Sequence, residues 1–290
     1  MTAAAAGAPG ELLKAAGWMA VALASFVLLA VSARELLDTM SAFQILFLRT
    51  VIGLGLIVGF GLLTRQTFHR TARLRLHLVR NVFHYAGQVC WVIAIGLLPL
   101  ATVFALEFTT PIWAAILAWL TLGERLDRGR LLATLLGFAG ILIILRPGVL
   151  PLDMRVLVPV AAALGFSVQL TATKALTRTD STLTIMFYMM LSQLVLGALP
   201  AGWTWSGIAP ADLPWIAGVG VAGLTAHLGV TRAFQHADLT LVLPMDFLRL
   251  PLIALVGALA YAEPFDPAVL AGAGLIVLGN YQSLRGHRRR

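Results

Sequence analysis

The chain has 290 residues, of which 59% are hydrophobic and 12% charged, and its mean hydropathy is +0.89. Soluble domains carry about 25% charged residues, so this chain has too little polar surface to cover a water-facing globule. The composition excludes a soluble enzyme, a disordered chain and a disulfide-stabilised secreted domain, and it predicts a polytopic membrane protein.

The net charge is +8, from 21 Lys and Arg against 13 Asp and Glu. In a soluble protein such an excess would point to nucleic acid. Here the basic residues lie in short loops and in the C-terminal residues 288–290. Lys and Arg gather in the cytoplasmic loops of membrane proteins. We therefore predict no nucleic-acid partner, a multi-pass inner-membrane location, and cytoplasmic N- and C-termini.

Ten apolar segments, each about as long as a bilayer-crossing helix, follow one another along the chain. Lipid offers the backbone no hydrogen-bond partners, so each segment is predicted to be a helix. Residues 1–16 are small and weakly charged and are predicted to be a disordered lead-in, and residues 285–290 a basic cytoplasmic tail. The spans are expected near 17–34, 42–63, 77–98, 101–122, 130–146, 156–175, 182–200, 213–234, 240–261 and 267–284.

The two halves of the chain, 17–148 and 156–284, resemble each other in pattern. Glu107-Phe108 corresponds to Asp246-Phe247. Pro111 corresponds to Pro251 with a one-residue slip, and Glu124 to Glu263. Five spans are an odd number, so the second half inserts upside down relative to the first. We therefore predict an all-α membrane protein with ten transmembrane helices in two inverted-topology five-helix repeats, an organisation typical of secondary transporters.

The segment EFTTPIWAAILAWLTLGERLDRGRLLATLLGFAGILIILRPG (107–148) resembles the EamA family of the drug/metabolite transporter superfamily. In that family a proline-containing fourth span leads into a Gly-Glu-Arg turn and a Gly-rich fifth span. The resemblance implies the ten-helix fold and a transport role. It says little about the cargo, since these motifs are structural. The second half departs from the pattern with Ala262-Glu263-Pro264 where the first has Gly-Glu-Arg.

Ionisable residues inside spans are costly and usually face a polar site or a partner. Glu107 and Asp246 occupy equivalent places in the fourth and ninth spans, so each is a candidate for binding a proton or a cationic group of a substrate. Arg249, also inside the ninth span, is a further candidate for binding the substrate. The alternative is structural: Glu107 paired with Arg49, and Asp246 with Arg249 at helical i, i+3 spacing.

Arg49 interrupts the apolar second span, and its guanidinium suits a carboxylate or phosphate of a substrate. An internal salt bridge or an interfacial position is the structural alternative. In the third span, polar and aromatic residues recur at helical spacing and share one face. Such a face lines a site for a small polar or planar molecule or makes hydrogen bonds between helices. The polar and aromatic residues of this span are Arg80, Asn81, His84, Tyr85, Gln88 and Trp91, and the candidates for the site are His84, Tyr85, Gln88 and Trp91.

No enzyme signature is present: GxxxxGK[ST], HExxH and GxSxG are absent, and Cys90 is the single cysteine. We predict no catalytic residues, no cofactor and no metal site. The expected function is secondary active transport of a small organic metabolite, with possible proton coupling through Glu107 or Asp246. An amino acid or related zwitterion is favoured, with Arg49 for its carboxylate and an acid for its ammonium. Nucleosides, vitamins or drug-like cations are alternative cargoes, imported or exported.

Two other classes of protein are weighed, a membrane-embedded enzyme and a non-transporting subunit. The first needs a catalytic cluster near one interface, which the sequence lacks. The second does not need matched acids in the two halves. A monomer is sufficient for the predicted transporter, because the two repeats supply both halves, and a dimer is possible.

Overall fold

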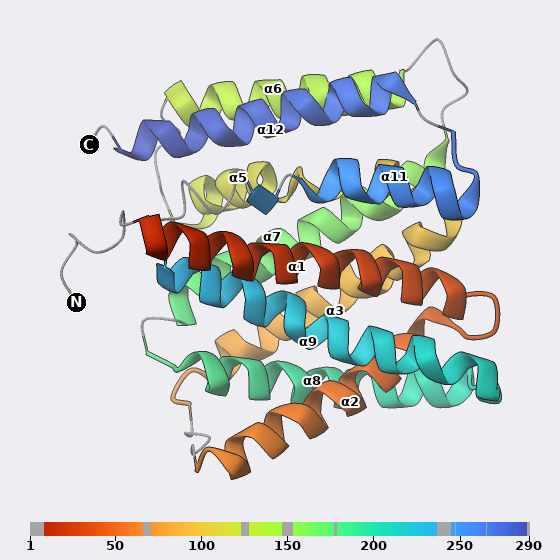
Figure 1. Ribbon diagram of the computed structural model, residues 1–290. Coiled ribbons are helices and arrows are strands. Elements are labelled where there is room, and N and C mark those ends of the chain that lie inside the picture. The colour runs from red at the N-terminus through yellow and green to blue at the C-terminus, as the bar shows by residue number, and fades with distance from the viewer. Residues whose placement is uncertain are drawn as a thin grey trace.

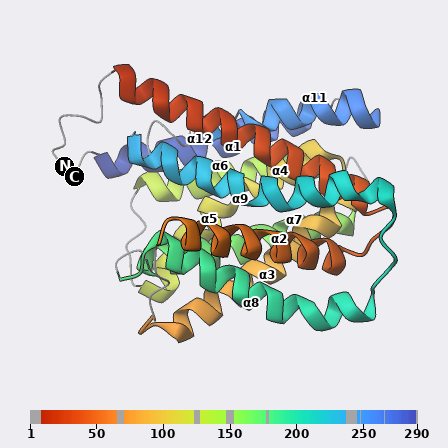
Figure 2. The same cartoon turned by 60° about the horizontal axis from the view of Figure 1, so that its bottom comes forward.

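The computed structural model describes residues 9–65, 71–122, 128–146, 153–176, 179–236, 245–246, 248–264 and 266–288. Over these residues the secondary structure consists of helices joined by turns, with no strand. The helices run roughly alongside one another, and the N- and C-terminal ends of the chain lie at the same end of the bundle (Figures 1 and 2). We call this the terminal end and the other the opposite end.

The first half of the chain forms six helices, because the fourth span is broken in two. They are α1 (Pro9–Leu36), α2 (Ala42–Leu63), α3 (Leu74–Leu97), α4 (Leu100–Glu107), α5 (Thr110–Leu122) and α6 (Arg128–Leu145). The second half opens on a short 3-10 turn, Met154–Val156. It continues with α7 (Leu157–Leu176), α8 (Thr182–Trp203), α9 (Leu213–His236), the helical residues 245–246, α11 (Arg249–Tyr261) and α12 (Pro267–Arg288).

Within the described residues, α1, α2, α7, α8 and α9 each hold a segment long and apolar enough to cross a membrane. The expected span 42–63 coincides with α2. Ser41 caps this helix by accepting a hydrogen bond from the Gln44 backbone N–H, and Ser181 caps α8 in the same way through Thr184.

Helices extend into both of the segments expected to flank the two halves. Helix α1 starts at Pro9, so residues 9–16 are helical, and residues 1–8 lie outside the described part. Glu11 accounts for the extension: it pairs with Lys14 one turn on and with His236 at the end of α9, both at 2.7 Å. At the C-terminus α12 continues to Arg288, so residues 285–288 of the predicted tail are helical.

The fourth predicted span is broken at Pro111. Helix α4 ends at Glu107 and α5 begins at Thr110, with Pro111 as its second residue. Proline lacks an N–H and clashes with the carbonyl four residues before it, here that of Glu107. The Thr110 hydroxyl donates to this freed carbonyl at 2.6 Å. Pro251 is the third residue of α11, so Glu107 and Asp246 each lie just ahead of a new helix.

Long-range packing pairs each half with the other. Helix α1 packs mainly on α9, α3 on α7, α2 on α8 and α6 on α12, while α4 contacts α11. The pairs α1–α9 and α6–α12 lie side by side in Figure 1. Helices α6 and α12 cross where Gly140 faces Gly272. A Cβ added to Gly140 would lie 2.4 Å from the Gly272 carbonyl oxygen.

We predict that Gly140→Ala lowers the unfolding temperature of the detergent-purified protein, at a cost of about 1–3 kcal/mol, because backbone cannot yield to the added methyl group. Gly274→Ala is the matched control: it lies in α12 with no atom within 4 Å of the added Cβ. The control should be neutral or slightly stabilising, since Ala favours a helix over Gly. Equal unfolding temperatures for the two variants would contradict this account of the crossing.

Candidate functional site

A buried arginine joins the two broken spans. Arg249, the first residue of α11, lies with its Nη1 3.2 Å from Glu107 Oε1 and its Nη2 3.1 Å from Asp246 Oδ2. Trp91 of α3 donates from Nε1 to the other Glu107 oxygen at 2.8 Å. We call these four residues the acid cluster. Two carboxylates against one guanidinium leave it with one excess negative charge.

Aromatic rings enclose the guanidinium of the acid cluster. The Arg249 Cζ lies 4.3 Å from the centroid of the Phe26 ring, 5.2 Å from that of Phe104 and 5.0 Å from that of Phe108. A cation over ring faces is attracted by their quadrupoles, and more strongly when it is desolvated. The rings therefore hold Arg249 in place. On the acid side of the cluster, Asp246 Oδ1 is buried without a hydrogen-bond partner among the described residues.

A second polar group surrounds Arg49 on α2. Its Nη2 donates to Gln193 Oε1 at 3.2 Å, and Gln193 Nε2 lies 3.2 Å from His84 Nδ1. His84 Nε2 in turn lies 3.1 Å from the side-chain amide of Gln88. We call these four buried residues the amide relay. It connects α2 and α3 of the first half to α8 of the second.

The amide relay fixes the protonation pattern of His84. Because the Gln193 oxygen accepts from Arg49, its nitrogen must donate to His84 Nδ1. A neutral imidazole carries its one proton on the other nitrogen. His84 Nε2 then donates. The atom placed 3.1 Å from it is Gln88 Nε2, so we assign the Gln88 amide the turned orientation, with Oε1 facing His84, because amide orientation is assigned from the hydrogen-bond network. The relay thus runs in one direction, from the Arg49 cation to Gln88.

Arg49 differs from Arg249 in its partners. Among the described residues no carboxylate lies within ion-pair distance of Arg49, and its Nε is buried without a hydrogen-bond partner. The structural alternative pairing Glu107 with Arg49 is therefore wrong: Glu107 pairs with Arg249. The pairing expected between Asp246 and Arg249 is confirmed.

His227 of α9 lies between the two groups. Its ring makes edge contacts with Phe26, which stacks on Arg249, and with His84 of the amide relay, both at 6.4 Å between centroids. Tyr85 is also buried, but its hydroxyl points toward Gly197 of α8, where an added Cβ would lie 3.1 Å away. The structure therefore brings seven of the eight residues predicted for the site into two adjoining groups and leaves Tyr85 at a helix contact.

Sequence reasoning missed Gln193, which is fully buried and contacts two of the predicted residues. The available signal was a single amide in the apolar run LSQLVLGAL (191–199). Gly223 of α9 was also missed: an added Cβ there would lie 3.2 Å from Arg49 Cδ, so the glycine leaves room for this side chain. No group of three or more metal-ligating side chains occurs in the part of the chain that is described.

Comparison with known proteins matches residues 13–146 to the EamA-like transporter family. The riboflavin transporter of Brucella anthropi is 32% identical over 217 residues, covering 72% of this chain and 75% of that protein. The pseudopaline exporter CntI of Pseudomonas aeruginosa is 31% identical over 276 residues, covering 92% and 95%. The S-adenosylmethionine uptake transporter of Rickettsia felis is 23% identical over 261 residues, covering 90% and 89%.

One solved crystal structure of a protein shares the fold. It is 20% identical, with a TM-score of 0.65, and the match covers 97% of this chain and 98% of the other. At this identity the match shows a shared fold and carries no information on the cargo.

We predict opposite stability effects for the two buried arginines. Arg249→Met leaves two acids without their counter-ion and should destabilise the protein by about 3–5 kcal/mol. Arg49→Met removes a charge that has no carboxylate partner in the described structure and should be neutral or stabilising. Unfolding temperatures of the two variants in detergent measure the difference. A larger loss for Arg49→Met than for Arg249→Met would refute this assignment of the ion pairs.

Proposed function

Because the chain belongs to the EamA-like transporter family of the drug/metabolite transporter superfamily, we propose that it is a secondary active transporter for a small organic metabolite. It works by alternating access in the inner membrane, with both termini cytoplasmic. The basic loops support this orientation. One chain holds both halves of the site, so a monomer is sufficient.

We further propose that residues 17–148 and 156–284 are inverted repeats. The helix contacts support this, because the largest contacts between the halves have counterparts when the halves are exchanged. The pair α1–α9 exchanges with α3–α7, and α2–α9 exchanges with α8–α3. The pairs α2–α8 and α6–α12 map onto themselves. Substrates of such transporters bind near the midplane, at the junction of the repeats and beside broken helices.

The site favours a zwitterion such as an amino acid or a related molecule. Arg49 offers a buried guanidinium to a carboxylate. The acid cluster has one excess negative charge and an unpartnered Asp246 oxygen, which suit an ammonium group. Trp91, Gln88 and His84 line the side toward α3. The observation that carries the proposal is the unequal pairing: two carboxylates are found at Arg249 and none at Arg49 among the described residues.

The relatives' names leave the cargo open. They include S-adenosylmethionine, riboflavin and pseudopaline, and both uptake and export, with no free amino acid among these three. The zwitterion proposal therefore rests on the charges of the site alone. Nucleosides, vitamins and drug-like cations remain the competing cargoes. Binding of any of them in a ligand screen would replace the zwitterion proposal.

A thermal-unfolding screen of the purified protein against zwitterions, nucleosides, vitamins and cationic drugs tests the cargo, since a ligand that binds the folded state raises the unfolding temperature. We expect a carboxylate-bearing ligand whose affinity falls about tenfold or more in Arg49→Ala. Gln193→Glu should also lower the affinity for this ligand. It puts a carboxylate where the Gln193 oxygen now accepts from Arg49, and this carboxylate would compete with that of the ligand.

Arg49→Lys and Arg155→Ala are the controls for the screen. The first keeps the charge, so it should retain much of the affinity. The second removes an exposed arginine that pairs with Asp153 away from the site, and it should leave the affinity unchanged. A ligand whose affinity is equal in wild type, Arg49→Ala and Gln193→Glu would remove Arg49 from the site.

Proton coupling through Glu107 makes a separate prediction. A proton on Glu107 competes with its ion pair to Arg249, so binding of a proton and closure of the acid cluster are linked. In Glu107→Gln we expect the ligand identified above to bind, but its transport into proteoliposomes to lose its dependence on pH. Glu11→Gln, an acid at the terminal end, is the control that should keep the wild-type pH profile. An unchanged profile in Glu107→Gln would exclude this residue as the coupling site.

A further inference from the structure

A third buried arginine, Arg80 on α3, lies between the amide relay and the terminal end. It is 4% exposed and precedes His84 by four residues, which places it about 6 Å nearer the terminal end along the helix axis. Arg80 Nε donates to Thr173 Oγ1 at 2.6 Å and Nη1 to Asn81 Oδ1 at 2.7 Å. Nη2 lies 3.8 Å from the Met189 sulfur. All three partners are neutral.

A buried cation without a counter-ion is expensive, because desolvation costs several kcal/mol that no opposite charge repays. Among the described residues no carboxylate pairs with Arg80. The sulfur at Nη2 is a weak acceptor. An arriving carboxylate would replace it with a charge-assisted hydrogen bond, which is about twice as strong as a neutral one. Among the described residues the charge of Arg80 has no counter-ion, so it would gain a favourable electrostatic interaction when an anion binds beside it.

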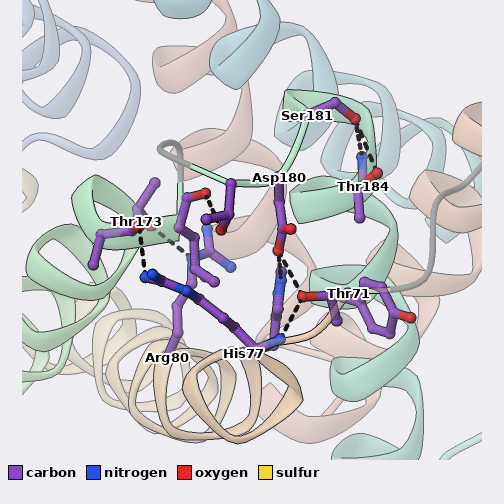
Figure 3. A network of polar contacts seen from close by, with 12 residues as sticks. Thr71, His77, Arg80, Thr173, Asp180, Ser181 and Thr184 are labelled. Atoms are coloured by element: carbon purple, nitrogen blue, oxygen red, sulfur yellow. Dashed lines mark hydrogen bonds and ion pairs between the residues drawn. The ribbon is translucent and has the colours of Figure 1, made fainter.

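Beyond Arg80, three residues tie the first half to the second at the terminal end (Figure 3). Asp180, between α7 and α8, accepts from Thr71 Oγ1 and pairs with His77 Nε2, both at 2.7 Å. We call Thr71, His77 and Asp180 the latch. Burial alone would raise the pKa of Asp180, but the hydrogen bonds from His77 and Thr71 hold it below its ordinary value. Asp180 therefore stays ionised at neutral pH.

The latch, Arg80 and the central site follow one face of α3. His77, Arg80, His84, Gln88 and Trp91 are spaced by three or four residues, so their side chains line one stripe of the helix. His77 is fully buried and its ring lies against Tyr188, 4.9 Å between centroids. A molecule that moves along this stripe from the acid cluster and the amide relay toward the terminal end passes Arg80 and then the latch.

We propose that Arg80 is a second, transient site for the carboxylate of the transported molecule, and that the latch closes this site at the terminal end. The inference rests on the proposed transport of a carboxylate-bearing molecule. A carboxylate that leaves Arg49 loses its counter-charge within the bundle, and Arg80 supplies the next one. Opening of the latch then gives the carboxylate access to water.

Cysteine labelling tests this inference without a known substrate. The reporter is Ser192→Cys in a Cys90→Ala background, because Ser192 accepts a hydrogen bond from Asn81, the direct partner of Arg80. Cys90 is the native cysteine and must be removed. The probes are anionic sulfonatoethyl methanethiosulfonate and cationic trimethylammonioethyl methanethiosulfonate. They are applied to vesicles that present the C-terminus, and thus the terminal end, to the medium.

Two changes in labelling rate are expected. Asp180→Asn should accelerate labelling by both probes about tenfold, because the latch is weakened. In the Asp180→Asn background we expect the anionic probe to label faster than the cationic one. The ratio of the two rates, divided by the same ratio for a free thiol in solution, should be about ten. Arg80→Gln should abolish this preference and Arg80→Lys should keep it, which separates charge from shape.

Three results would overturn the inference. The first is an anion preference that survives Arg80→Gln. The second is labelling that Asp180→Asn does not change. The third is a loss of preference in Arg80→Lys as complete as in Arg80→Gln. Because the probes are not substrates, a normal labelling pattern with no carboxylate ligand in the thermal screen would reject the proposed cargo alone. A carboxylate ligand with no effect of Arg80 on labelling would reject the second site alone.

Discussion

The ion pairs of Arg249 hold the two halves of this protein together at the place where two membrane-spanning segments are broken. Glu107 ends α4, Asp246 precedes α11, and one guanidinium reaches both carboxylates. Within a bilayer, broken helices are tolerated only where protein side chains satisfy the freed polar groups. Threonine hydroxyls do this for the carbonyls ahead of Pro111. The acid cluster is therefore both a structural joint and the most polar part of the bundle.

Charge is distributed unevenly along the bundle. Arg249 is compensated twice, whereas Arg49 and Arg80 meet only neutral partners among the described residues. Buried charges without counter-ions lower stability, and natural proteins retain such costs mainly at functional sites. The proposed transport of a carboxylate-bearing molecule gives a reason to keep them, because such a cargo would supply the missing charge during only part of the cycle. The stability of the empty protein and its affinity for cargo are then opposed.

Contacts between the halves occur at both ends of the bundle. At the opposite end, Arg34 pairs with Glu263 at 2.6 Å, and Glu263 also accepts from the Leu100 backbone N–H. At the terminal end, Asp180 joins His77 and Thr71. Alternating access requires that one set of contacts opens while the other holds. Both sets are small and polar, so water can replace their hydrogen bonds when the halves separate, at a modest net cost.

The sequence by itself determined the membrane class and the helical class, and it placed a proline, Pro111, where the fourth predicted span is broken. These follow from composition, segment length and the geometry of proline, which are properties of the chain or of its neighbouring residues. It also identified nearly all the charged members of the site, since an ionisable residue in an apolar span stands out. It could not determine their partners. Glu107 pairs with Arg249 and not with Arg49 because α4 meets α11 in the fold. Gln193 is an ordinary amide in an apolar run until α8 packs on α2 and places it between Arg49 and His84. Pairing depends on which helices of the two halves come into contact. These helices are far apart in the sequence, so no local sequence pattern encodes their contact.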